Sequence, residues 1–283
     1  MSTDPEGSRV TKMPPNLGVT FIGHSLDNEL LTVYVGPNRK EFVLHKKLLC
    51  RTSDFFEKAF NSDFQEGKQV RDHAFDEDSP SAFAIFVNWL YRATIEAGSS
   101  RSYLYKLVDL YIFLDKICLM SLKDTVMDIL QDIALKHKLD DIILFPILKK
   151  MARCAAPYKG LTKFCLYAVV DSFVDKHGRE NDDRTTVSVR KEDTEMVWKM
   201  CRDNLDLFHS YMLRIEFLVA AGLKSESYWN PRARKETSKA NRCFFHCHED
   251  TWDCRAKTSV IEEAHFINDE VVEELWVLGA QQE

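Results

Sequence analysis

The chain has 283 residues, 45% of them hydrophobic, and a formal net charge of -6 at pH 7. This length is sufficient for two hydrophobic cores, so we expect two domains. The negative charge disfavours general nucleic-acid binding, because basic side chains at phosphates supply most of that affinity. The sequence has no run of about 18 apolar residues, as a membrane helix needs, and no apolar segment of signal-peptide type at the N-terminus. We therefore expect a cytoplasmic or nuclear protein that does not contact a membrane.

The N-terminal part predicts a disordered lead followed by a β-hairpin. Residues 1–27 are polar and rich in Pro and Gly, without a sustained period. Thr32–Val35 is β-branched and aromatic, residues 36–38 are turn formers, and Glu41–Leu44 is again extended in character. Two antiparallel strands joined by a tight turn are the expected result.

Helical periodicity replaces the strand pattern after the hairpin. Val70–Phe75 alternates weakly and predicts a short third strand, and Ser79 followed by Pro80 predicts a helix start, because Ser caps free amides and Pro suits the first helical position. The apolar residues expected on buried helical faces are Leu48, Leu49, Phe55, Phe56, Ala59, Phe60, Phe83, Phe86, Val87, Leu90, Tyr91, Leu104, Leu107, Val108, Tyr111, Leu114, Leu122, Val126, Ile129, Leu130 and Ile133.

The second half is predicted to be mostly helical. Apolar residues recur at helical spacing in Ile142–Met151, Leu161–Val174, Met196–Leu207 and Tyr211–Leu223. The segment 178–193 is rich in Arg, Glu and Asp, and we interpret it as a solvated polar loop rather than a binding element.

Several residues of the first half occur where one known family carries similar residues. They are Phe42, His45, Leu48, Leu49, Ser53, Phe55, Phe56, Phe83, Leu90, Tyr91, Leu110, Tyr111 and Leu114-Asp115-Lys116. With the order of strands followed by helices, they make residues 28–137 resemble a BTB/POZ domain. The resemblance implies an α+β fold with a short sheet and a helical cluster. We accordingly divide the chain into a lead at 1–27, a BTB/POZ-like domain at 28–137, a helical region at 138–242 and a C-terminal tail at 243–283.

The resemblance implies protein–protein interaction rather than catalysis. In many BTB proteins a hydrophobic-x-Glu motif helps to bind a cullin, which makes the protein a substrate adaptor of a ubiquitin ligase. Phe64-Gln65-Glu66 occupies the matching place, and we expect partner-binding residues at Phe64, Glu66, Tyr91 and Tyr111. A homodimer face around Phe42, Leu48 and Leu30–Tyr34 is one alternative. A self-associating transcriptional or chromatin regulator is another, favoured by basic residues at 232–242 but opposed by the acidic residues that follow them.

A second constellation lies in the tail, where Cys243, His246, His248 and Cys254 form a C-x2-H-x-H-x5-C pattern. Two thiolates and two imidazoles suit tetrahedral zinc, so we predict a structural zinc site. The one-residue spacing of the histidines places both rings on one side only in an extended or looped segment. Cys247 could replace one ligand, and Ile261 and Phe266 are expected to dock the tail on the helical body. The cluster resembles a Cys/His tail that occurs downstream of BTB domains in fungal proteins.

Two alternatives to zinc remain open at this cluster: a loop without metal, and disulfide or redox use. Because the cluster lies more than a hundred residues beyond the BTB-like domain, we expect metal loss to loosen the tail alone. The other cysteines, Cys50, Cys118, Cys154, Cys165 and Cys201, each lie singly in apolar stretches and are expected in the core.

Catalytic patterns are missing from the sequence. G-x-S-x-G, H-E-x-x-H, G-x-G-x-x-G and a Gly-rich lysine loop do not occur. His45 has no Ser or Cys at a spacing that would make it a catalytic base, and we interpret it as structural. The protein is therefore predicted not to be an enzyme.

Overall fold

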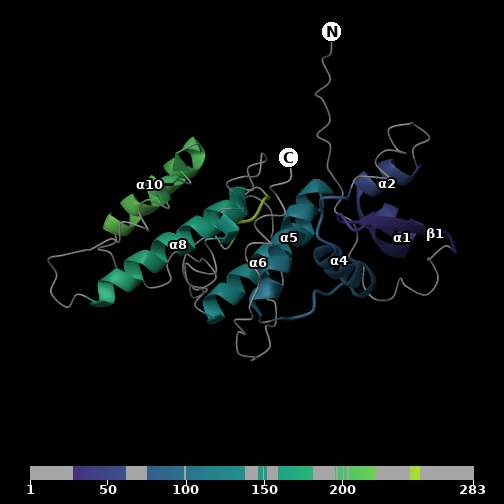
Figure 1. Ribbon diagram of the computed structural model, residues 1–283, viewed down its shortest axis with the longest axis horizontal. Helices are drawn as coiled ribbons and strands as arrows, with labels where there is room; N and C mark the ends of the chain where they lie inside the picture. The colour runs from purple at the N-terminus through teal and green to yellow at the C-terminus, as the bar shows by residue number, and fades with distance from the viewer. Residues whose placement is uncertain are drawn as a thin grey trace, which may run out of the picture. The chain divides into compact units, whose positions relative to one another are not determined.

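The computed structural model describes residues 28–61, 75–98, 100–137, 146–148, 150–151, 159–180, 195, 197–199, 201–202, 204–220 and 243–248. The chain forms two compact units, residues 1–95 and 96–283. Figure 1 shows their helices and strands. The predicted lead at 1–27, the third strand at 70–74, the polar loop from 181 and the tail beyond 248 lie outside the described residues.

The first unit begins with the predicted β-hairpin. Strand β1 (Leu30–Val35) pairs antiparallel with β2 (Lys40–His45), with Val33 opposite Phe42. Gly36 starts the turn at φ 77° and accepts a hydrogen bond from the amide of Arg39 at 2.8 Å. A Cβ on Gly36 would lie 2.7 Å from Pro80 Cγ, so this position requires glycine for both its backbone angle and its surroundings.

Three helices of the first unit enclose an aromatic core. They are α1 (Lys46–Thr52), α2 (Asp54–Asn61) and α4 (Pro80–Arg92). Phe56, Phe83 and Phe86 are each 0% exposed. The rings of this cluster, at centroid distances of 4.8–6.2 Å from a neighbour, are Phe42, Phe55, Phe56, Phe60, Phe75, Phe83 and Phe86. As predicted, Ser79 caps α4 by accepting a hydrogen bond from the amide of Ala82 at 3.3 Å, with Pro80 in the first turn.

The second unit contains long helices. Helices α5 (Arg101–Lys116) and α6 (Met120–His137) pack together, and α8 (Lys159–Glu180) packs with α10 (Leu205–Ala220). Every residue of the predicted α5 and α6 stripes is at most 7% exposed. These findings confirm an α+β fold with a helical C-terminal region. No described helix is long and apolar enough to cross a membrane.

Three predictions are wrong in detail. Residues 178–180, expected at the start of the polar loop, still belong to α8. The helix expected over 196–207 does not extend through Asn204, whose side-chain oxygen instead accepts a hydrogen bond from the amide of Leu207 at 2.9 Å and so starts α10. Cys118 is exposed rather than in the core, because it follows the end of α5 with φ 56°. Cys50, Cys165 and Cys201 are buried as expected, and Cys154 lies outside the described residues.

Candidate metal centre on the C-terminal turn

Three of the four predicted metal ligands come together on one short turn. The ligand atoms of Cys243, His246 and His248 all lie within 4.8 Å of one another. Residues 243–248, which we call the C-terminal turn, form turns and bends rather than a helix, as the histidine spacing predicts. The amide of His246 donates to the carbonyl of Cys243 at 2.8 Å and closes the turn. Cys254 lies outside the described residues.

The two histidine rings face each other through one nitrogen each. His246 Nδ1 lies 3.1 Å from His248 Nε2, and the ring centroids are 5.2 Å apart. Two imidazole nitrogens on one tetrahedral zinc, each at about 2.0–2.1 Å from it, are about 3.3–3.4 Å apart. The observed spacing therefore differs little from that of a ligand pair. Cys243 would move by about 1 Å at most, because a bound sulfur and nitrogen are about 3.6 Å apart.

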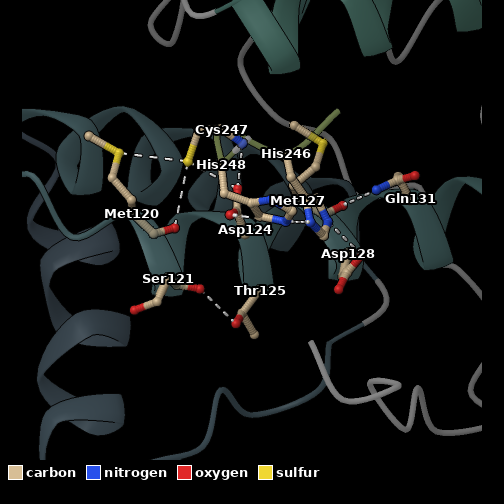
Figure 2. Close-up of polar contacts among 10 residues, drawn as sticks. All are labelled: Met120, Ser121, Asp124, Thr125, Met127, Asp128, Gln131, His246, Cys247 and His248. Carbon is tan, nitrogen blue, oxygen red and sulfur yellow. Dashed lines mark hydrogen bonds and ion pairs between the residues drawn. The ribbon is translucent and has the colours of Figure 1, made fainter. Parts of the chain in front are cut away.

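The other nitrogen of His246 contacts helix α6. His246 Nε2 lies 3.0 Å from Asp128 Oδ1, and both side chains are 2% exposed. Figure 2 shows this contact together with the neighbouring residues of α6. His248 Nε2 lies 4.0 Å from a second α6 carboxylate, that of Asp124.

Cys247 is directed toward α6 by both its backbone and its side chain. Its amide donates to Asp124 Oδ1 at 2.8 Å, and its thiol donates to the same oxygen at 3.0 Å. Burial, followed by this hydrogen bond to Asp124, raises the pKa of the Cys247 thiol to about 12. The sulfur also lies 3.7 Å from Met120 Sδ (Figure 2). In this arrangement Cys247 fastens the turn to α6.

The phenylalanines between the ligands anchor the turn on α8. Phe245 is 0% exposed, and its ring lies 5.5 Å from that of Phe164 and 6.1 Å from that of Tyr167. The turn also passes close to Gly160, where a Cβ would lie 2.2 Å from the carbonyl oxygen of Phe245. Ile261 and Phe266, the residues that the sequence suggested for this docking, lie outside the described residues, so their role stays a prediction.

Sequence reasoning missed Asp124, Asp128 and Phe245. The sequence did contain one signal for the two aspartates. They are four residues apart on a helix with a strong apolar stripe, and this spacing places both carboxylates on one face. We expected the Cys/His cluster to be independent of the first 137 residues because it lies far along the chain. That expectation is wrong for α6, because His246 and Cys247 contact this helix directly.

The predicted partner-binding residues occupy different environments. Tyr91 is half-buried, and its hydroxyl lies 2.8 Å from His45 Nδ1 and accepts a hydrogen bond from the His45 amide at 3.1 Å. The histidine thus has a structural contact, in agreement with its interpretation. Tyr111 is 1% exposed, under the Lys123 ammonium 4.7 Å from its ring. Phe64 and Glu66 lie outside the described residues. Partner binding by these four residues stays a prediction.

Comparison with known proteins identifies the N-terminal part of the chain. The hairpin, the short helices after it and the helical pair α5–α6 follow one another within the first 137 residues, which gives the order of strands followed by helices. The family model of the BTB/POZ domain matches residues 24–131, so this is a BTB/POZ domain-containing protein. Such domains are typically interaction modules rather than enzymes. No curated protein and no solved structure matches the chain.

Proposed function

We propose that this protein is a substrate adaptor whose BTB/POZ domain binds a cullin. The observation that carries the proposal is the family match over residues 24–131, within which Phe64-Gln65-Glu66 provides a hydrophobic-x-Glu motif. An aromatic side chain can fill a pocket on a partner while a nearby carboxylate orients the docking. The helical region beyond the domain would then recognise the substrate.

The test is a pull-down of the full chain with a cullin N-terminal domain. We expect binding by the native protein and at least a tenfold loss in the Phe64→Ala/Glu66→Lys variant. The matched control is Phe208→Ala/Glu216→Lys, which makes the same two changes at exposed positions of α10. Absence of binding by the native protein, or equal binding by both variants, would contradict the proposal.

A second candidate function is self-association through the hairpin. Cross-strand pairs place Leu30, Thr32, Tyr34 and Val43 on the face opposite the buried Val33 and Leu44. Leu30 is 55% exposed and Val43 is 56% exposed. Exposed apolar side chains on a strand pair favour contact with another chain. A self-associating transcriptional or chromatin regulator would use this face, and its basic run at 232–242 lies outside the described residues.

Light scattering on the purified chain distinguishes the two candidates. If the hairpin face pairs two copies, the native protein is a dimer and Val43→Glu is a monomer. Val219→Glu serves as the control, because Val219 is an equally apolar residue of α10 with 63% exposure. A native monomer that binds a cullin would exclude this second candidate.

For the C-terminal turn we propose a structural zinc ion bound by Cys243, His246, His248 and Cys254. The proximity of the first three donors supports the proposal, and their Cys/His chemistry suits zinc. A fourth protein ligand would close the coordination shell and leave no position for a substrate. Metal analysis of the purified protein should give one zinc per chain. A Cys254→Ser variant that keeps both its metal and its thermal stability would exclude Cys254 as a ligand.

A further inference from the structure

We infer that Asp128 of α6 is the carboxylate partner of the metal ligand His246, so that the site is built jointly by the C-terminal turn and α6. The inference rests on the proposed zinc site and deepens it. Asp128 is a positioning residue: its role is to orient the imidazole and fix its tautomer, while His246 Nδ1, His248 Nε2 and Cys243 Sγ are three of the atoms that would bind the metal.

The first step concerns the proton on His246. A carboxylate only accepts hydrogen bonds, so the 3.0 Å contact between Nε2 and Asp128 Oδ1 places a proton on Nε2. In the neutral ring this leaves the lone pair on Nδ1. Nδ1 is also the nitrogen that lies 3.1 Å from His248 Nε2. The hydrogen bond to α6 therefore directs the Nδ1 lone pair toward His248 Nε2, on the side where the other donors lie.

The second step concerns charge. Asp124 and Asp128 are 5% and 1% exposed and lie four residues apart on one helical face. Burying a carboxylate carries a large desolvation cost unless it is hydrogen-bonded and its charge is balanced. A divalent cation bound by the turn would place positive charge beside both carboxylates. In metalloproteins, a ligand histidine commonly donates its second N–H to such a carboxylate.

The third step concerns preorganisation. The turn is fixed on one side by Phe245 packed against Phe164 and on the other by the Cys247 amide bonded to Asp124. These contacts do not use the proposed ligand atoms. The His246 ring is consequently presented to Asp128 by packing, and the carboxylate completes its orientation. This differs from an isolated zinc finger, which is unfolded without its metal and folds only when the metal binds.

Zinc affinity of the full chain, measured by competition with a chelating dye, tests the inference. Asp128→Asn keeps the shape of the side chain, and we expect it to weaken zinc binding about 10- to 100-fold. Asp128→Glu, which keeps the carboxylate, should recover part of the loss. Asp206→Asn, at an exposed position of α10, removes the same charge elsewhere and should leave the affinity unchanged.

Nitrogen NMR of the histidine rings reports which nitrogen of His246 carries the proton or the metal. A purely structural role of Asp128 would not change this assignment. In the metal-free native protein we expect the proton of neutral His246 on Nε2, and in the zinc form we expect the metal on Nδ1. Asp128→Asn should reduce the preference for the Nε2–H tautomer. Zinc bound through Nε2, or an Asp128→Asn variant with native zinc affinity, would overturn the inference while leaving the zinc site intact. Native protein that binds no zinc would overturn both proposals.

Discussion

The aromatic core of the first unit and the C-terminal turn hold short chain segments in place by different means. In the first, Phe56 contacts the rings of Phe55, Phe60, Phe75 and Phe86, and the contacts are apolar. In the second, six residues combine one buried ring with hydrogen bonds to the carboxylates of α6. Apolar packing needs no particular protonation state or ligand. With the proposed zinc site the turn would depend on both, and its stability would then change with metal supply while that of the aromatic core would not.

Phe56→Ala should produce the largest effect. Removing a fully buried ring from a cluster leaves a cavity and costs about 3–5 kcal/mol. Phe56 is 0% exposed, whereas Phe208 of α10 is 45% exposed and serves as the control. Urea unfolding followed by circular dichroism should show the loss for Phe56→Ala and less than about 1 kcal/mol for Phe208→Ala. Equal effects would mean that the aromatic cluster is not the stabilising core of its unit.

Gly160→Ala should produce the second-largest effect. It should destabilise the protein, although the same change usually stabilises a helix. Replacing Gly by Ala within a helix ordinarily stabilises it by about 0.5–1 kcal/mol. Here the added Cβ would lie 2.2 Å from the Phe245 carbonyl oxygen, so the turn must move away from α8. We expect a net loss of about 1–3 kcal/mol in unfolding free energy measured with zinc present. A stability gain would show that Phe245 does not dock at this position.

Chelation of zinc should loosen the turn and leave the hairpin unchanged. The Cys247 amide is bonded to Asp124, and its hydrogen exchange should rise about tenfold on metal removal, equivalent to about 1.4 kcal/mol. Amides in the β1–β2 ladder should exchange at the same rate with and without chelator. Faster exchange throughout the hairpin would mean that metal binding stabilises both units and would remove the contrast.

The smallest effects are expected at two helix caps, one in each unit. Ser79 accepts a hydrogen bond from the amide of Ala82 at 3.3 Å, and Ser100 accepts one from the amide of Tyr103 at 3.0 Å. Each Ser→Ala change should cost about 1 kcal/mol, with Ser→Gly costing only a few tenths. Thermal unfolding of the four variants measures this. A cost of zero at either site would show that the cap contributes nothing to its helix.

Much of the fold is predictable from the sequence because periodicity reports buried faces. The α5 stripe that includes Leu104, Leu107 and Tyr111 is buried as its spacing indicates, and the turn at residues 36–38 joins the expected strands. Cap chemistry is equally local, and Ser79 follows it. Periodicity alone fails at Asn204. Apolar residues continue at helical spacing on both sides of it, but its side chain caps a new helix there.

The candidate site is only half predictable for a physical reason. The ligand types and spacing of Cys243, His246 and His248 lie within six residues, so the sequence displays them directly. Their partners Asp124 and Asp128 come from another part of the chain, and tertiary contact is not a property of local spacing. The docking of Phe245 was not predictable either, because a Phe between Cys and His does not indicate which helix will bury it.

The contact between Asp128 and His246 also sets an order of events during synthesis. The two residues are 118 positions apart, and at about 5–20 residues per second the ribosome needs about 6–24 s to pass from one to the other. Helix α6 is therefore made well before the residues that complete the site. A nascent chain carries the two carboxylates before the proposed metal ligands, so that zinc uptake would mark the chain as translated past Cys254, the last of the four proposed ligands.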